Sequence, residues 1–247
     1  MTIVKWQDAN DYRPGSHLSF VTGDLSLVTQ TRSTMKRLLA LVAVALSATL
    51  RAEEPPKPPL PIMTLPVRVH LVQSDAIPTM HTTLVEADIR RIFGKANTVW
   101  AQAGIRFELE SIGPTEASAP SAEVRLRSEF VRVKSMIPKE RLSATAMNVC
   151  YVKEVKPNGF YYDGLIVVKD TAALKEVPGG LDEPLPRVTS HEIGHLLGLQ
   201  HRQHTSNLMQ SGTTGFSLNE TEITTARAKA QQRLNRSGEK HETLVPQ

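Results

Sequence analysis

The chain has 247 residues, 40% of them hydrophobic and 22% charged, which is an ordinary globular composition and excludes a disordered or fibrous protein. Its 29 lysines and arginines nearly balance its 25 aspartates and glutamates, so the charge gives no indication of a nucleic-acid-binding surface. The single cysteine, Cys150, excludes an intrachain disulfide.

A stretch near the start of the chain has the pattern of an export signal. The segment "MKRLLALVAVALSATL" opens with Met35 and two basic residues and continues with the mostly apolar residues 38–50. This apolar run is too short to span a bilayer comfortably and is typical of a signal peptide. We therefore expect residues 35–52 to be a signal peptide and the protein to be secreted or periplasmic, without stable membrane insertion after cleavage. A buried core helix and an uncleaved membrane anchor are the alternatives.

Composition also indicates where the folded domain begins and ends. Residues 1–34 show no convincing periodicity, and we expect them to be an unstructured extension or to precede the true initiator, Met35. Residues 53–64 contain the proline-rich stretch "EEPPKPPLP", which predicts an extended spacer. The folded domain is predicted over residues 65–234, with a polar tail at 235–247.

The folded domain opens with a strand and a helix. Residues 66–72 alternate apolar and polar side chains, as a half-buried strand does. Residues 83–104 carry apolar side chains at spacings of three and four and end in glycine, which predicts an amphipathic helix. Thr83 and Glu86 have the spacing of a capping box at its start.

The middle of the domain reads mainly as strands. Residues 105–112 alternate again, so that the first three elements form a β–α–β unit. Residues 128–137 favour a short helix before a proline. Two further strands are predicted at 147–155 and 161–170, separated by a Pro-Asn-Gly turn at 157–159.

The last part of the domain is predicted to be helical. The pattern favours a helix over residues 185–197. A second helix runs from Asn219 to about Leu234, because Asn219 and Glu222 have the spacing of a cap and its partner.

The segment "SHEIGHLLGLQH", residues 190–201, lies at the end of the first of these helices. Residues four apart lie on one face of a helix, so His191 and His195 point two imidazoles the same way. Neutral imidazole is a common ligand of zinc. Glu192 lies about 100° around the helix, where its carboxylate can reach a water at the metal and act as a general base.

A third histidine follows after a glycine. His201 lies six residues beyond His195 and cannot share the helix face, so the chain must turn back. Gly198 permits this turn because glycine adopts positive φ without a Cβ clash. Three protein ligands leave one tetrahedral position open, which is typical of catalytic zinc. The alternative is an ordinary amphipathic helix with structural histidines.

Together with Met209, eight residues after His201 in "HRQHTSNLMQSG", the motif HExxHxxGxxH resembles the metzincins, a clan of zinc peptidases, and among them the matrixin and reprolysin branches. The resemblance implies that Met209 forms an apolar floor beneath the zinc-binding histidines. Arg202, directly after the third histidine, departs from the residues of the named subfamilies. His204 is a further histidine near the motif, and we interpret it as a solvated turn residue.

The resemblance also implies the fold. It predicts an α+β class, with a twisted mixed sheet, two long helices and a small C-terminal subdomain that ends in a helix. One edge strand of the sheet would bind the substrate peptide by β-augmentation. The alternation of residues does not indicate which of the two late strands forms that edge.

These observations together predict a secreted, monomeric zinc endopeptidase that acts on proteins or peptides and not on nucleic acid. Its Zn²⁺ is held by His191, His195 and His201, and Glu192 is its general base, with Gly198 and Met209 supporting the site. The alternative is a non-catalytic zinc-containing binding module on the same fold. Cys150 is expected to be a small buried hydrophobe; a cysteine that caps the zinc is the alternative.

Overall fold

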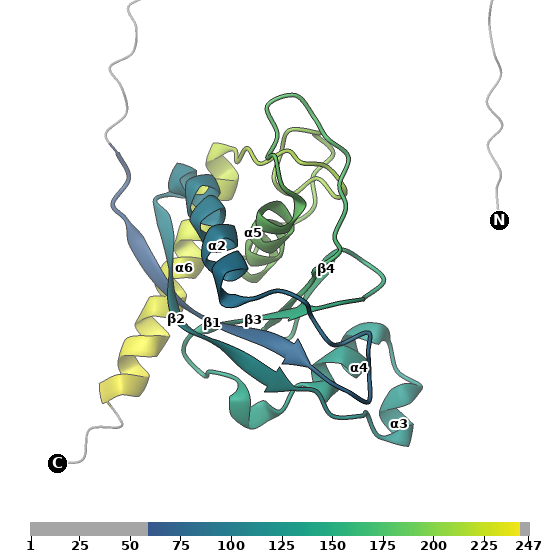
Figure 1. The fold of residues 1–247 in the computed structure, drawn as a ribbon. Helices are drawn as coiled ribbons and strands as arrows, with labels where there is room; N and C mark the ends of the chain where they lie inside the picture. Colours follow the sequence, from purple (N-terminus) through teal and green to yellow (C-terminus); the bar gives the residue numbers. More distant parts are fainter. Residues whose placement is uncertain (1–58, 243–247) are drawn as a thin grey trace, which may run out of the picture. The chain divides into compact units, whose positions relative to one another are not determined.

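Five strands form one mixed sheet in the order β2-β1-β3-β5-β4 (Figure 1). The three pairings among β2, β1, β3 and β5 are parallel, and β4 pairs with β5 in the antiparallel direction. The strands are β1 (Met63–Gln73), β2 (Ile105–Glu116), β3 (Met147–Val152), β4 (Gly159–Tyr162) and β5 (Leu165–Lys169). The antiparallel edge strand confirms the predicted mixed sheet.

This computed structural model describes residues 59–242, and their side chains through Arg236. The described residues lie within one compact unit, Pro58–Gln247. The predicted extension at 1–34, the predicted signal peptide at 35–52 and the first residues of the spacer lie outside them. No helix among the described residues is both long enough and apolar enough to cross a bilayer.

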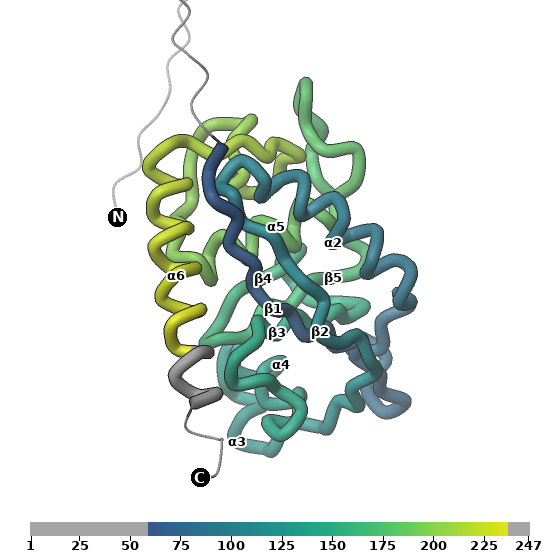
Figure 2. Tube along the Cα trace, turned by 90° about the vertical axis from the view of Figure 1, so that its left-hand side faces the viewer, coloured from purple at the N-terminus to yellow at the C-terminus, as the bar shows by residue number. Residues whose placement is uncertain are grey.

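Helices cover both faces of the sheet. Figure 1 shows α2 (Glu86–Trp100) and α5 (Pro184–Leu196) on one face, with α3 (Ala122–Arg125) and α4 (Glu129–Met136) on the other. The last helix, α6 (Glu220–Glu242), runs beside β1, as the turned view in Figure 2 also shows. Two short 3₁₀ turns complete the elements, η1 (Ala101–Ala103) and η2 (Lys139–Arg141).

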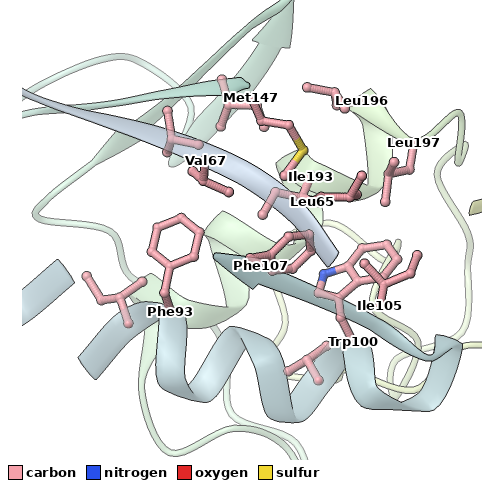
Figure 3. Close-up of a cluster of buried hydrophobic side chains, with 14 of the residues drawn as sticks. Leu65, Val67, Phe93, Trp100, Ile105, Phe107, Met147, Ile193, Leu196 and Leu197 are labelled. Carbon is pink, nitrogen blue, oxygen red and sulfur yellow. The ribbon is translucent and has the colours of Figure 1, made fainter. Parts of the chain in front are cut away.

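The main core lies between the sheet, α2, α5 and α6. In Figure 3, Trp100 of α2 faces Phe107 of β2, and their ring centroids are 6.0 Å apart in an edge-to-face arrangement. Phe93 meets Phe107 in the same way at 6.3 Å. Aromatic pairs of this geometry add to the stabilisation that comes from burial alone. The core therefore holds α5 firmly against the sheet through Ile193, which is fully buried.

The start of α2 differs from the prediction. The helix begins at Glu86 after Val85, and Asp88 rather than Glu86 closes its first turn, because the Asp88 carboxylate accepts a hydrogen bond from the Val85 N–H at 3.0 Å. Thr83 instead donates its N–H to Asp170, at 2.9 Å. The predicted capping box was wrong because a carboxylate from beyond β5 binds the threonine.

The predicted strand at 161–170 is a hairpin. Strands β4 and β5 are joined by Asp163 and Gly164, which both have positive φ, at 44° and 83°. Asp-Gly is a usual sequence at the two central positions of a two-residue hairpin turn. Such a turn matches the right-handed twist of the two strands that it joins. The turn at 157–159 therefore leads from β3 into β4, although β5 lies between these two strands in the sheet.

Other predicted elements agree with the structure apart from their ends. Strand β1 begins at Met63, within the predicted spacer, and β2 continues to Glu116. The short helix before Pro138 is α4, and the site helix is α5. Helix α6 continues through Glu242, beyond the predicted end near Leu234.

Candidate metal centre and active site

The last two turns of α5 present His191 and His195 side by side. Pro184 occupies the first turn of the helix, where a missing N–H is harmless and the fixed φ favours helix formation. The two Nε2 atoms are 3.1 Å apart, and the ring planes are nearly perpendicular, at 87°. Spacing along one helix face therefore brings two imidazole nitrogens to one point, as the motif predicts.

Gly198 turns the chain back toward these histidines. Its φ is +86°, and its N–H donates to the His195 carbonyl at 3.0 Å, which ends the helix. The turn places His201 Nε2 at 3.1 Å from His195 Nε2. The ligand atoms of all three histidines lie within 4.8 Å of one another.

The spacing of the three nitrogens fits zinc. Tetrahedral ligands at zinc–nitrogen distances of about 2.0–2.1 Å lie roughly 3.3 Å apart, close to the 3.1 Å of both Nε2 pairs. This is the only such group of histidine, cysteine or acidic side chains among the described residues. The structure therefore contains a three-histidine site of the right size for one small divalent cation.

In the two histidines of α5, hydrogen bonds fix which ring nitrogen faces this point. His191 Nδ1 lies 2.7 Å from the Leu208 carbonyl and His195 Nδ1 lies 2.9 Å from the Leu199 carbonyl. A carbonyl only accepts, so each Nδ1 carries the hydrogen and each Nε2 keeps its lone pair for a metal. Burial, with a smaller contribution from the nearby Arg187 charge, lowers the pKa of His191 to about 3. Burial also lowers the pKa of His195.

Glu192 lies on α5 beside the histidines and is 5% exposed. Burial raises the pKa of its carboxyl group to about 8, against the opposing effects of the Arg187 charge and the Tyr161 backbone N–H. A carboxyl group with a raised pKa is a stronger base than an exposed one once it is ionised. The environment of Glu192 therefore suits the transfer of protons at neutral pH.

Strand β4 approaches Glu192 at a glycine. A Cβ added at Gly159 would lie 3.1 Å from Glu192 Cγ and 2.8 Å from Val188 Cγ1. Distances this short leave no room for a methyl group. The absence of a side chain at Gly159 thus lets the edge strand pass directly beside the carboxylate.

Met209 packs against α5 at Gly194, the residue before His195. It is fully buried, and its sulfur would lie 2.5 Å from a Cβ added at Gly194. Its N–H donates to Asn207 Oδ1 at 2.7 Å. The methionine therefore packs directly against α5, and Gly194, which the sequence analysis passed over, provides the room for it.

A buried carboxylate links this turn to α6. Glu222 is 1% exposed and accepts hydrogen bonds from Arg202 Nε at 2.8 Å, from Asn207 Nδ2 at 2.8 Å and from the Asn219 N–H at 2.9 Å. Asn219 in turn accepts from the Glu222 N–H, which confirms the predicted cap. Arg202, which departs from the subfamilies, is thus the partner of Glu222.

Glu222→Gln is expected to lower the free energy of unfolding of the zinc-loaded protein by about 1–3 kcal/mol, the usual contribution of hydrogen bonds to a charged group. Burial opposes ionisation of Glu222, but its hydrogen bonds and Arg202 outweigh burial and hold its pKa below the usual value. The contribution of ionised Glu222 to the free energy of unfolding is therefore complete above about pH 4.5, and it is lost as the pH falls through the pKa of Glu222 in the folded protein. Denaturant unfolding at pH 7 and pH 4 measures it; a difference between variant and wild type that grows toward pH 4 contradicts the account.

A cavity of about 620 Å³ opens beside the three histidines. Residues 157–161, which include the start of β4, line it together with Ser211 and Gly212. Strand β4 and the segment that follows Met209 therefore both border this cavity, to which we refer as the cleft.

Two other residues that the sequence analysis considered, His204 and Cys150, lie apart from the three histidines of the site. His204 is exposed, and its Nδ1 lies 2.9 Å from Ser206 Oγ, as expected of a turn residue. Cys150 is fully buried in β3, in the second core beneath the sheet, and burial raises the pKa of its thiol. Arg187, which the sequence analysis did not single out, is buried next to His191.

Comparisons with known proteins agree with this geometry. The matrixin family model matches residues 170–234, the part of the chain that contains the three histidines, Glu192 and Met209. No curated protein matches the sequence. Among solved structures, mirolysin in complex with compound 9 is 14% identical with a TM-score of 0.51, over 73% of this chain and 98% of that chain. A zinc-dependent peptidase from Methanocorpusculum labreanum is 14% identical with a TM-score of 0.36, over 66% and 99%.

The similarity to mirolysin is at the level of the fold, because the identity is low. The matrixin match covers the segment that supplies the site. The segment 170–234 thus resembles the matrixin family and contains the three-histidine group, and the fold of the chain resembles that of mirolysin.

Proposed function

We propose that the chain is an exported zinc endopeptidase. The observation that carries the metal assignment is the set of three imidazoles, whose Nε2 atoms lie 3.1 Å apart in consecutive pairs. Neutral nitrogen donors in this number favour zinc and leave a coordination position for water. When bound, zinc acts as a Lewis acid and lowers the pKa of its water to about 7.

Glu192 is proposed as the general base. Its carboxylate would take a proton from the attacking water and deliver it to the amine that leaves. The Glu192 carboxylate is buried between α5 and β4, beside the proposed metal ligands, and a non-catalytic metal site does not need a carboxylate there.

The substrate is proposed to bind as an additional strand along β4. One side of β4 pairs with β5, and no described strand pairs with its other side. This free edge lines the cleft next to the histidines. An extended peptide placed there gains main-chain hydrogen bonds regardless of its sequence, which suits an enzyme that cleaves within protein chains.

Gly159→Ala is expected to reduce kcat/KM at least about tenfold while zinc remains bound, because the added methyl group displaces either β4 or Glu192. Gly113→Ala on β2 is the matched control, since a Cβ there meets nothing within 4 Å. Steady-state kinetics and metal analysis of both variants test this. Full activity of Gly159→Ala would show that the close approach has no catalytic importance.

Export is proposed from the basic and apolar pattern of residues 35–52. When the gene is expressed with its own start, the mature protein is expected to begin between Ala48 and Glu53. N-terminal sequencing of the secreted or periplasmic fraction checks this. Recovery of peptides from residues 1–34 in the mature protein would contradict it.

Cleavage of casein tests the function as a whole. The purified protein is expected to convert casein to internal fragments, to stop when phenanthroline is added, and to recover when zinc is restored. Mass spectrometry of the fragments separates an endopeptidase from an exopeptidase. Protein that holds one zinc ion and cleaves nothing would favour the non-catalytic binding module instead.

A further inference from the structure

Arg202 directly follows the third histidine, and two separate interactions hold it in place. Its backbone N–H donates to the Met209 carbonyl at 2.9 Å. Its side chain donates through Nε to a carboxylate oxygen of Glu222 at 2.8 Å. Arg202 is therefore bound both to the turn that carries Met209 and to the first turn of α6.

The carboxylate that receives the Arg202 side chain is fixed. Glu222 is 1% exposed, and α6 packs into the main core. The same carboxylate also accepts hydrogen bonds from Asn207 and Asn219, at 2.8 and 2.9 Å. An ion pair between two mobile surface side chains contributes little, partly because both must be ordered. Here one partner is already ordered, so the pair can restrain Arg202.

The histidine beside Arg202 has no such restraint on its own ring. In His191 and His195, Nδ1 donates to a backbone carbonyl, and a bond of this kind usually orients a metal-binding imidazole. The side chain of His201 is exposed, and its Nδ1 has no hydrogen-bond partner among the described residues. The place of this ring therefore depends on the backbone on either side of it.

That backbone has an anchor on each side of His201. Before it, Leu199 is 3% exposed, and its N–H donates to the Gly194 carbonyl at 2.9 Å. After it comes Arg202, while Gln200 and His201 between the two anchors are exposed. The core holds the first anchor, and the Glu222 carboxylate and the Met209 carbonyl hold the second.

We infer that Arg202 is a positioning residue for the third imidazole. Through its pair with Glu222, it holds the backbone that presents His201 toward His191 and His195. The inference rests on the proposed zinc site and assigns a role to the residue at which this chain departs from the named subfamilies. Its consequence is that the affinity for zinc depends on a side chain that does not touch the metal.

Arg202→Met removes the donor and the charge but keeps an unbranched side chain. The fold is expected to persist, because Glu222 keeps its bonds to Asn207 and Asn219. In the full-length chain, the Kd for zinc is expected to rise about tenfold, the usual effect of losing a group that orients a ligand. Arg202→Lys can still donate to the single carboxylate oxygen and is expected to stay within about threefold of wild type. Competition with a chromophoric chelator measures each Kd.

A double-mutant cycle shows whether Arg202 acts through His201. When His201→Ala has already removed the ring, adding Arg202→Met is expected to change the Kd by less than about twofold. Arg90→Met is the matched control, because Arg90 Nε also donates to one carboxylate oxygen, of Glu86, at 2.9 Å, and α2 supplies no residue of the cleft. It should leave the Kd unchanged in both backgrounds. An equal loss from Arg202→Met in both backgrounds, or no loss in either, would overturn the inference.

NMR of the imidazole rings in the zinc-loaded protein provides a second readout that needs no turnover. In Arg202→Met, the signals of His201 are expected to shift or broaden, while those of His191 and His195 stay as in wild type. Changes in all three rings or in none, or failure of the variant to fold, would overturn the inference, since they indicate a general role in stability or no role. A wild type that binds zinc but cleaves no peptide would overturn the proposed function alone.

Discussion

Glu192→Gln is expected to retain one zinc ion and to lose at least about 100-fold in kcat/KM, the usual contribution of a positioned general base. Glutamine has nearly the same shape as glutamate, so the packing of Gly159 against this side chain is preserved. It cannot, however, accept a proton. Steady-state kinetics on a fluorogenic peptide measure the loss, and metal analysis of the same sample shows whether zinc is retained.

Glu108→Gln is the matched control, because Glu108 is an exposed glutamate on β2, on the opposite edge of the sheet from β4. It should leave kcat/KM unchanged. A Glu192→Gln enzyme with nearly full activity would remove Glu192 from the mechanism. Loss of zinc from this variant would instead point to a role for Glu192 in holding the ligands.

His201→Ala is expected to weaken zinc binding by more than about 100-fold, which is the upper end of the effect of removing a residue that only supports a ligand. His201 is the proposed ligand that does not come from α5, so its removal leaves the two histidines of the helix in place as the only remaining imidazole ligands of the proposed site. Metal analysis after exhaustive dialysis measures this: wild type keeps its zinc and the variant loses it.

His204→Ala serves as the control, because it removes a histidine only three residues away that is exposed and lies outside the trio. It should retain zinc like wild type. Equal retention by His201→Ala and wild type would show that the third imidazole is not a ligand. Loss of zinc by both variants would indicate that the turn, rather than the ring of His201, holds the metal.

The arrangement of the trio could be predicted because its causes are local. His191 and His195 share a face through the period of the helix, and Gly198 reverses the chain within three residues of His201. The positions of the three histidines along the chain thus follow from local structure, although the Leu208 carbonyl, outside the motif, orients the His191 ring. The mixed sheet was predictable only through the resemblance to metzincins, because alternation of residues reveals a strand but not its neighbours.

What the sequence analysis missed depends on contacts between distant segments. From the sequence, Arg187 is an ordinary polar residue of a helix. Only the folded structure brings the carbonyls of Gln210 and Gly215 to its guanidinium group. Glu222 was recognised as a partner of Asn219, three residues away, but its bonds to Arg202 and Asn207 cross from α6 to the turn after the third histidine. Nothing in the local pattern distinguishes such a glutamate from one that faces water.

Two errors have different origins. Thr83 has the sequence of a helix cap, but Asp170, far along the chain, competes for its hydrogen bonds, so local preference was overridden by tertiary structure. The hairpin between β4 and β5 was instead encoded locally by Asp163-Gly164, a strong two-residue turn signal. That signal was present in the sequence and was read as part of one continuous strand.

X-ray absorption at the zinc edge of the purified, full-length protein tests the central claim most directly. The account predicts one zinc ion per chain with three imidazole nitrogens at about 2.0–2.1 Å and one oxygen from water. In His201→Ala measured with zinc added in excess, it predicts one imidazole nitrogen fewer. A chain without bound zinc, or a zinc ion closed by four protein ligands, would contradict it.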